Sequence, residues 1–544
     1  MESDNKIKDT ILSKSKYISG IQCLKYLWYL VNDPDSIPPY DDAALFRFQQ
    51  GHEVGEIAKK LYPEGVEIEH GNDIGTELKI AEIMTGLCSH EKLSGSSGLC
   101  KTGEKISATE RIPLFEPAFS YKNSFARADI LVPAEPDLWD IIEVKSSTSL
   151  KEINLHDISF QKYCYEGAGL KINRCYLMYI NKDYIKEQDT VDPHKFFIME
   201  DVTEKADFLL PDVESNIRIM LDMLNKKSCP QIKISTNCYN PYDCPLKEAC
   251  WEFLPKRNVF ELYRGKGLAF SLYNRGIIEI SQINETDILS PAQKIQQMAA
   301  DQEKVFVDRD NIGRFLSRLK YPLYFLDFET FATAIPRYNG LRPYQNIPFQ
   351  YSCNRIQSID DNCRQNFNFL AENDGTDPRE QFIESLRETL GYGCGSQELY
   401  DGSILKQPEG SILVYYESFE KNILRELAGS FPEHAPWIEH AISRIIDLYE
   451  PFGKFYYYNP LQKGSASLKN VLPALTGISY SGMEISNGQE ASVRYLDITF
   501  LKDSEDKADK EYIDKIRKDL LDYCGLDTEG MIFILRELYK LVND

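Results

Sequence analysis

Two carboxylates, Asp327 and Glu329, stand two residues apart in the run Tyr324-Phe-Leu-Asp-Phe-Glu-Thr. In a β-strand, side chains at positions i and i+2 project from the same face, about 6–7 Å apart. Carboxylates placed in this way can share a pair of Mg²⁺ ions, and such ions activate water for phosphodiester cleavage. An exposed acidic strand end would give the same short pattern, so the pair needs support from the rest of the chain.

Three further acids in the C-terminal half are candidates for the same metal centre. Glu420 follows an expected strand at residues 411–416, and Asp447 directly follows two isoleucines in Arg444-Ile-Ile-Asp. Asp527 lies on an expected helix, and Tyr523 lies one turn earlier on the same helical face. A phenol in that place can position an attacking water. The sequence therefore supplies enough acids for a metal-dependent hydrolase.

Basic and aromatic residues in the same half are candidates for holding a nucleotide. Arg342, Tyr344 and Gln345 follow the first expected strand, and Lys469 lies further along the chain. These side chains can stack on a base or contact a phosphate. Ordinary loop packing is an equally good interpretation of each of them.

This set of acids resembles the metal motifs of the DEDD exonucleases of the RNase H-like superfamily. Asp327 and Glu329 match the first motif, and Tyr523 with Asp527 matches the third motif in its tyrosine form. Glu420 occupies the place of the second motif, where the family has aspartate, so Asp447 remains an alternative ligand. The resemblance implies an RNase H-like fold and cleavage of DNA or RNA.

The amino-acid sequence of residues 320–544 also resembles a bacterial family of domains of unknown function with an RNase H-like core. The matching strings are Asp327-Phe-Glu-Thr-Phe, Ile335-Pro-x-Tyr, Gly340-Leu-Arg-Pro-Tyr-Gln, Pro348-Phe-Gln-Tyr-Ser and Gly464-Ser-x-Ser-Leu-Lys-Asn-Val-Leu-Pro-Ala-Leu. They are long enough to indicate the family, but they indicate no substrate.

The N-terminal half carries a second pattern, in which Asp129 precedes Glu143-x-Lys145 by thirteen intervening residues. Glu143 and Lys145 share one strand face, and a hairpin over residues 128–147 can bring Asp129 beside Glu143. Two acids can bind a metal ion, while a lysine can steady the charge of a phosphorane. The pattern alone is short enough to recur by chance.

Its companions make the pattern more specific. Gln161 and Tyr165 lie one turn apart on an expected helix, His52 is a possible metal ligand upstream, and Glu116 precedes the hairpin. Residues 10–255 thereby resemble the RecB-like branch of the PD-(D/E)XK nucleases. The resemblance implies catalytic roles for His52, Asp129, Glu143 and Lys145, with Gln161 and Tyr165 as the helical motif, and DNA as the substrate.

Three cysteines, Cys238, Cys244 and Cys250, follow this region at equal spacing, and Cys23 lies far upstream. This layout resembles that of RecB-like nucleases with an iron–sulfur cluster, which have one distant N-terminal cysteine and three near the end of the domain. Four thiolates bind a 4Fe–4S cluster or Zn²⁺. Iron–sulfur is favoured because zinc sites usually contain a closer cysteine pair. Cys229 is an alternative ligand, and the other cysteines, Cys524 among them, are interpreted as ordinary thiols.

The elements needed to position these residues alternate between strands and helices in both halves, which predicts α/β domains. We expect helices at 13–30, 51–62, 419–428 and 510–542. The expected organisation is a RecB-like domain at 1–255, a helical connector at 256–318 and an RNase H-like, DnaQ-type mixed-sheet domain at 319–544.

Composition limits the possible partners. The formal net charge of the 544 residues is −22, which argues against a generally basic nucleic-acid coat. A local basic run holds five lysines that suit either phosphate contacts or a solvated helix face: Lys6, Lys8, Lys14, Lys16 and Lys25. No stretch reaches the ~20 apolar residues of a membrane span, and the N-terminus lacks an export signal. We therefore expect a cytoplasmic protein with no membrane partner.

The combined expectation is a nuclease that uses Mg²⁺ or Mn²⁺ and acts on DNA, with RNA possible in the C-terminal half, in DNA repair, recombination or defence. The alternative is a nucleic-acid-binding protein in which one or both sites are inactive.

Overall fold

The computed structural model divides the chain into two compact units. Unit 1 holds the residues up to Phe253 together with Thr333–Tyr344, and unit 2 holds Leu254–Ala332 and the chain from Gln345 onward. The residues that the structure describes are 10–68, 74–87, 111–226, 228–284, 286–361, 363–391, 397–398, 404–405, 409–500 and 510–543. Lys6 and Lys8 of the basic run lie outside these ranges.

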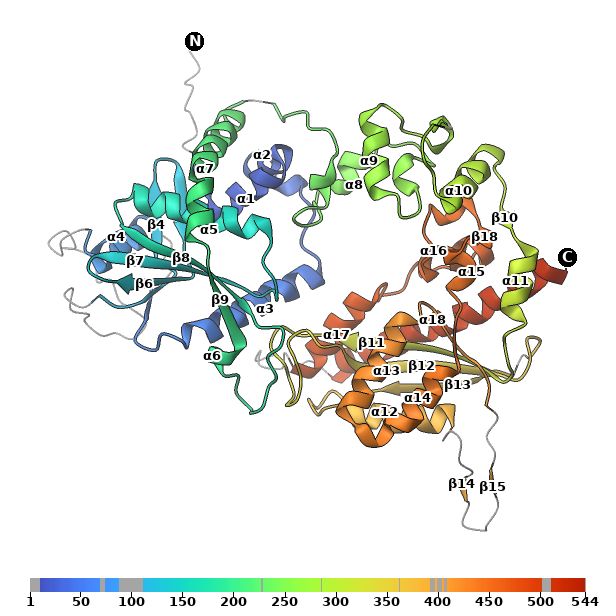
Figure 1. Ribbon diagram of the computed structural model, residues 1–544. Helices are drawn as coiled ribbons and strands as arrows, with labels where there is room; N and C mark the ends of the chain where they lie inside the picture. Colours follow the sequence, from blue (N-terminus) through green and yellow to red (C-terminus); the bar gives the residue numbers. More distant parts are fainter. Residues whose placement is uncertain are drawn as a thin grey trace. The chain divides into compact units, whose positions relative to one another are not determined.

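A six-stranded mixed sheet organises unit 1, in the order β2-β3-β6-β7-β8-β9. Its strands β6, β7, β8 and β9 are labelled in Figure 1. The strands of this unit are β1 Leu12–Ser13, β2 Val66–Glu67, β3 Leu114–Phe115, β4 Ala118–Tyr121, β5 Ser124–Arg127, β6 Ile130–Ala134, β7 Leu138–Lys145, β8 Ile172–Ile180 and β9 Phe197–Asp201. The hairpin expected at 128–147 is confirmed, because β6 and β7 pair antiparallel. A smaller sheet has the order β1-β5-β4.

Helices cover these sheets and join their strands. They are α1 Lys14–Gln22, α2 Leu24–Asn32, α3 Asp42–Lys59, α4 Ile74–Met84, α5 Glu152–Gly167, α6 Pro193–Phe196, α7 Thr203–Leu224 and α8 Lys247–Trp251. Helix α5 connects the parallel strands β7 and β8, as a crossover must. The single helix expected at 13–30 is wrong, because Cys23 is extended (φ −162°) and separates α1 from α2. The helix expected at 51–62 begins earlier, at Asp42, where the Asp41 side chain caps it.

Unit 2 is built on a five-stranded mixed sheet in the order β13-β12-β11-β16-β17. Its strands are β10 Phe306–Val307, β11 Leu323–Phe331, β12 Ile347–Ile356, β13 Gln365–Leu370, β14 Gln397–Glu398, β15 Ile404–Leu405, β16 Ile412–Val414, β17 Ile445–Asp447 and β18 Tyr457–Tyr458. Strand β12 runs antiparallel to its neighbours β11 and β13, whereas β16 runs parallel to β11 and β17 parallel to β16.

The helices of unit 2 are α9 Lys266–Asn274, α10 Pro291–Gln302, α11 Arg309–Leu316, α12 Arg379–Leu390, α13 Ser418–Ser430, α14 Ala435–Ser443, α15 Glu450–Gly453, α16 Leu468–Thr476, α17 Gly488–Phe500 and α18 Lys510–Asn543. The helices expected at 419–428 and 510–542 correspond to α13 and α18. Residues 256–318 contain helices as expected, but they belong to the compact body of unit 2 rather than forming a separate connector.

Strand β11 is buried on both faces, and this orients its acids. Tyr324, Leu326 and Phe328 pack in a core with α12, α13 and α14. Leu323 and Phe325 face the opposite core, which contains residues of α18. Because side chains alternate along a strand, the acids two and four residues beyond Phe325 continue the face that is turned toward α18. Across the described ranges, no helix combines the length and apolar character that crossing a membrane requires.

Candidate functional site

Three carboxylates of unit 2 converge on one point. Asp327 and Glu329 come from β11 and Asp527 from α18, and their ligand oxygens all lie within 4.8 Å of one another. Glu329 and Asp527 are each only 6% exposed. Buried carboxylates this close together repel one another unless protons or a cation neutralise them. The arrangement therefore has the donor chemistry of a site for a hard divalent cation.

Packing between α18 and the sheet holds Asp527 in place. The neighbouring residue, Thr528, pairs its hydroxyl with that of Ser352 (2.9 Å) and accepts a hydrogen bond from the Asn354 amide (2.8 Å), both on β12. The Cys524 thiol lies one turn earlier, 3.5 Å from Asp327 Oδ2. Cys524 therefore contacts the acidic site rather than being a remote core thiol.

The electrostatics of the triad follow from burial. Burial raises the pKa of Asp327 and of Glu329 well above the ordinary values, and the neighbouring carboxylates raise both further. Burial also raises the pKa of Asp527, to about 6, although hydrogen bonds from Tyr480 and Tyr523 and the charge of Lys469 act in the opposite direction. Bound cations would reverse these shifts, because they favour the ionised carboxylates.

The fourth acid can be chosen from its contacts. Glu420 lies in the first turn of α13, is 2% exposed, and has a buried Oε2 atom with no hydrogen-bond partner. After burial, the charge of Asp327 is the largest cause that raises its pKa. Asp447 instead accepts backbone hydrogen bonds from Tyr416 (2.8 Å) and Tyr449 (2.9 Å). Glu420 is thus available to a ligand at the triad, whereas Asp447 stabilises a turn.

One cation and two phenols border the triad. Lys469 stands 5.3 Å from the Tyr523 ring centroid and 5.6 Å from that of Tyr480. Burial lowers the pKa of Lys469, and the charges of the triad oppose that shift. The Tyr480 hydroxyl donates to Asp527. Tyr480 had no signal in the sequence, since it lies in a loop 47 residues before Asp527.

The other two candidates for nucleotide contact lie in a different place from the one expected. Arg342 and Tyr344 belong to the segment Thr333–Tyr344, which packs with unit 1 although its flanking strands β11 and β12 belong to unit 2. The Tyr344 hydroxyl donates to the Ser146 carbonyl, directly after Lys145. In the structure both residues therefore belong to unit 1, although the expected domain at 319–544 includes them.

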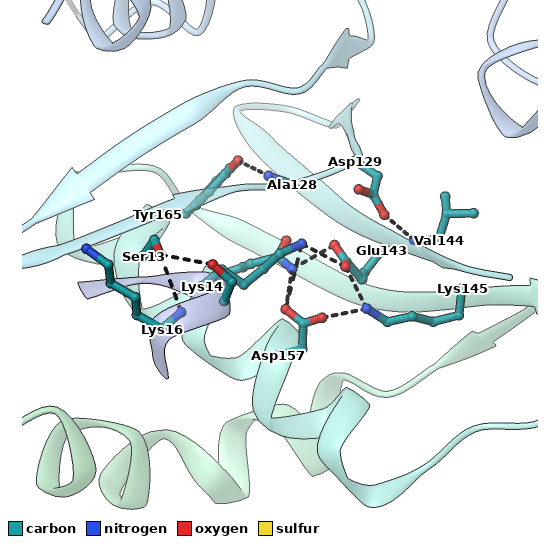
Figure 2. Close-up of polar contacts among 12 residues, drawn as sticks. Ser13, Lys14, Lys16, Ala128, Asp129, Glu143, Val144, Lys145, Asp157 and Tyr165 are labelled. Atoms are coloured by element: carbon teal, nitrogen blue, oxygen red, sulfur yellow. Dashed lines mark hydrogen bonds and ion pairs between the residues drawn. The ribbon is translucent and has the colours of Figure 1, made fainter. Parts of the chain in front are cut away.

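A second charged cluster lies in unit 1 (Figure 2). Glu143 is 2% exposed, and its Oε1 accepts from Lys145 (2.7 Å) and from Lys14 (2.8 Å), while Oε2 accepts from Gln161 (2.7 Å). Lys145 also pairs with Asp157. Burial lowers the pKa of Lys145, but the charges of Asp157 and Glu143 raise it more, so the net shift is upward. The predicted Glu143, Lys145 and Gln161 therefore do meet.

Asp129 lies next to this cluster rather than inside it. Its Oδ2 accepts the backbone N–H of Val144 at 2.6 Å (Figure 2). Burial raises the pKa of Asp129, and the Glu116 carboxylate adds to that shift. Tyr165 is fully buried, and its hydroxyl accepts from the Ala128 N–H (2.8 Å) and donates to the Pro117 carbonyl. Tyr165 therefore braces the backbone beside Asp129 and Glu116.

His52 is an exposed residue of α3. Within the described ranges, no three His, Cys, Asp or Glu side chains other than the triad of unit 2 bring ligand atoms within 4.8 Å of one another. His52, Asp129 and Glu143 consequently do not converge as a set of metal ligands in this structure.

Lys14 and Asp157 are residues of this cluster that sequence reasoning missed. Asp157 lies four residues before Gln161, so the one-turn spacing that relates Gln161 to Tyr165 could have indicated it. Lys14 was visible only as part of the basic run. Its 129-residue separation from Glu143 hid the pairing.

The four predicted cluster cysteines gather in unit 1. Cys23, Cys238, Cys244 and Cys250 line a single cavity of about 60 Å³. Burial raises the pKa of Cys23, and it raises that of Cys244 to about 11, with the other thiolates adding to both shifts. Cys229 does not line the cavity. The donor set fits a thiolate-bound metal group, although no three of these sulfur atoms lie within 4.8 Å of one another.

Fold and site together define a mixed α/β protein with a largely buried carboxylate triad whose donors suit a divalent cation. Residues 324–467 match the model of a domain of unknown function, DUF2779. This match begins within β11 and includes Asp327, Glu329, Glu420 and Asp447. No curated protein matches the chain.

Proposed function

We propose that the protein is a metal-dependent nuclease that hydrolyses phosphodiester bonds, with an RNase H-like site of DEDD type in unit 2. The observation that carries this proposal is the convergence of Asp327, Glu329 and Asp527 from two distant elements within 4.8 Å. The unpartnered Glu420 Oε2 adds a fourth donor. A divalent cation would relieve the mutual repulsion of these acids, of which Glu329, Glu420 and Asp527 are buried and Asp327 is partly buried.

The donor set fits Mg²⁺ or Mn²⁺, because both ions take carboxylate oxygens. Asp327, Glu329 and Asp527 would hold the ions, with Glu420 completing the set. When bound, the ions supply Lewis-acid activation of water and neutralise charge on the phosphate. Asp447 is assigned a structural role because its Oδ1 already accepts hydrogen bonds from two backbone N–H groups.

The chain's own residues account for the rest of the site. The hydroxyls of Tyr480 and Tyr523 fix Asp527, so that its carboxylate keeps one orientation. Lys469 brings a positive charge to the edge of an acidic site, where it can contact a phosphate oxygen and hold Asp527 ionised. Each of these roles concerns binding or orientation, which is what phosphoryl chemistry chiefly requires of a protein.

For unit 1 we propose a RecB-like nuclease site acting on DNA, formed by Asp129, Glu143, Lys145 and Gln161. The support is the contact of Glu143 with both Lys145 and Gln161, and the position of Asp129 against the same strand. Metal binding there would require Glu143 to exchange at least one of its present hydrogen bonds. The exposed position of His52 makes it a weaker candidate ligand.

For the cysteine cavity we propose a 4Fe–4S cluster held by Cys23, Cys238, Cys244 and Cys250. A tetrahedral Zn²⁺ site with Zn–S bonds of about 2.3 Å would set its sulfurs about 3.8 Å apart. The thiols in this cavity are more widely spread, and a four-iron cluster offers each thiolate a different iron. Its role would be to join the start of α2 to the chain before and within α8.

The proposal is tested with the full chain, Mg²⁺, and end-labelled single-stranded DNA, duplex DNA and RNA. Four proteins are compared: wild type, Asp327→Asn, Lys145→Met and the double variant. We expect each single variant to lose one activity and the double variant to lose both, with Mg²⁺ dependence throughout. Degradation that is unchanged in the double variant would refute both site assignments.

A second candidate function is a nucleic-acid-binding protein in which the site of unit 1 is inactive. The observation that favours it is that Glu143 already uses both oxygens for Lys14, Lys145 and Gln161. In that case the Lys145→Met variant would keep every activity of the wild type but would bind duplex DNA more weakly.

A further inference from the structure

Lys14 occupies a central place in the charged cluster of unit 1. It is the first residue of α1, and its Nζ lies 2.8 Å from Glu143 Oε1 and 3.7 Å from Asp157 Oδ1. Figure 2 shows its side chain directed at the same carboxylates that Lys145 approaches from β7. The cluster therefore contains two ammonium groups from distant parts of the sequence of unit 1, one on α1 and one on β7.

The position of Lys14 is fixed at both ends of α1. Before the helix, β1 pairs with β5, and Ser13 caps the first turn through the Lys16 N–H. At the other end, the Gln22 side chain donates to the carbonyls of Asn237 (3.0 Å) and Tyr242 (2.7 Å). A short helix anchored in this way holds its first residue with little freedom, as a preorganised site requires.

Contact between α1 and α5 fixes the same geometry from the side. The rings of Tyr17 and Phe160 stack at 4.6 Å, and both side chains are fully buried. Helix α5 also carries Asp157, so the helix that supplies Lys14 and the helix that supplies its second carboxylate pack directly together. A solvated helix face, the simpler interpretation of the basic run, does not describe Lys14.

Lys145 and Lys14 differ in their contacts, and the difference indicates different roles. Lys145 binds both Glu143 and Asp157 closely, and its side chain is 18% exposed. Lys14 binds Glu143 closely but Asp157 only loosely, and its side chain is 25% exposed. An ammonium group has three donors, so Lys14 retains capacity for an acceptor that arrives from solvent.

We propose that Lys14 is a phosphate-binding residue of the unit 1 site, and that its ammonium contacts a non-bridging oxygen of the DNA backbone at or next to the bond to be cleaved. This inference rests on the proposed nuclease function of unit 1. It adds to the Asp, Glu-x-Lys and Gln pattern a second lysine delivered by α1. It also explains why the first helix must be anchored to the region of Asn237 and Tyr242.

The test uses the full chain carrying Asp327→Asn, so that cleavage reports unit 1, and a labelled DNA duplex with Mg²⁺. Into this background we introduce Lys14→Met, Lys14→Arg and, as a matched control, Lys16→Met. Lys16 lies on the same helix, and among the described residues it forms no ion pair with Glu143 or Asp157. Steady-state rates are measured at several salt concentrations.

We expect Lys14→Met to lower kcat/KM about 10–100-fold, the range for a lost hydrogen bond to a charged group. The slope of log kcat/KM against log salt should become shallower by about 0.9, the contribution of one phosphate contact on duplex DNA. Lys14→Arg should recover most of the rate, and Lys16→Met should stay within about twofold of its parent.

The outcomes separate the inference from the function beneath it. If the parent shows no cleavage, or if Lys145→Met leaves its cleavage unchanged, the nuclease function of unit 1 is refuted together with the role of Lys14. If Lys145→Met abolishes cleavage but Lys14→Met behaves as Lys16→Met does, only the role of Lys14 is refuted. A slower Lys14→Met with an unchanged salt slope would also overturn phosphate binding, because the residue would then merely orient Glu143.

Discussion

Replacing Glu420 with glutamine should stabilise the metal-free protein while removing its response to Mg²⁺. Glu420 is 2% exposed, its Oε2 has no partner, and burial raises its pKa well above the ordinary value. Leaving a buried polar group unsatisfied costs about 1–3 kcal/mol, and more for a charged one. A neutral amide of the same shape escapes the charge penalty, so we expect a gain of about 1–3 kcal/mol at neutral pH.

The sign of the pH dependence follows from proton linkage. A carboxyl group whose pKa is raised by folding binds more protons in the folded state, so the stability of the wild type falls as the pH rises. The advantage of Glu420→Gln should therefore be largest above the folded pKa of Glu420. It should disappear as the pH falls below about 4.3, the ordinary pKa of glutamate, where the wild-type side chain is neutral in both states.

The assay is thermal unfolding of unit 2 within the full chain, with EDTA or with Mg²⁺. A ligand at one hundred times its dissociation constant adds about 2.7 kcal/mol, and each kcal/mol is worth about 2–4 °C for a domain of this size. Wild type should gain that shift with Mg²⁺, and Glu420→Gln should lose most of it. Glu417→Gln is the matched control, since Glu417 pairs with Lys421 at the surface, and it should behave as wild type.

For Asp447→Ala we expect the opposite result, and this variant tests whether Glu420 or Asp447 is the fourth ligand. It leaves the N–H groups of Tyr416 and Tyr449 without their acceptor, which should cost about 2–5 kcal/mol, yet the Mg²⁺ shift should remain. If Asp447→Ala abolishes the Mg²⁺ shift while Glu420→Gln preserves it, the assignment of the fourth ligand is refuted.

Three further predictions concern single side chains. Tyr165→Phe removes two buried hydrogen bonds and should lower the free energy of unfolding, measured in urea, by about 1–3 kcal/mol. Tyr163→Phe on the same helix is the control and should change it by under about 0.5 kcal/mol. Equal effects of the two variants would contradict the role of Tyr165 in holding the backbone. Cys250→Ser should abolish brown colour and absorbance near 400 nm and reduce bound iron, while Cys363→Ser, an exposed thiol, should keep both; stoichiometric zinc in the wild type would contradict the cluster. Lys469→Met should raise the pKa of Asp527 above about 6 and so move the acid limb of the pH–rate profile to higher pH. Lys469→Arg should return the limb to its wild-type position. An acid limb that does not move in Lys469→Met would disprove the effect of Lys469 on Asp527.

Local patterns in the sequence predicted the parts of the fold that depend on short-range periodicity. Alternation placed Asp327 and Glu329 on one face of a strand, and β11 has that form. Helical spacing placed Tyr523 and Asp527 on one face of α18, and both side chains are turned into the site. The hairpin that precedes Lys145 was likewise predicted, because alternating apolar runs with a polar turn between them define it.

Features that depend on tertiary packing could not be obtained in this way. The choice between Glu420 and Asp447 is decided by backbone N–H groups whose positions depend on the turn after β16. The segment Thr333–Tyr344 lies between two adjacent strands of unit 2 but belongs to unit 1, and its loop-like composition does not say which unit it packs with. The break at Cys23 is a backbone conformation within an otherwise helical pattern.

The lysines of the two charged clusters reach their carboxylates only through the fold. Lys14 lies 129 residues from Glu143 in sequence, and Lys469 lies far from both β11 and Asp527, yet each approaches its carboxylates in the fold. Each lysine offsets part of the negative charge of its cluster, so the net charge of −22 does not by itself give the local potential. Because a buried carboxylate cluster must be neutralised by protons or by cations, removing either lysine should make its site depend more strongly on divalent metal.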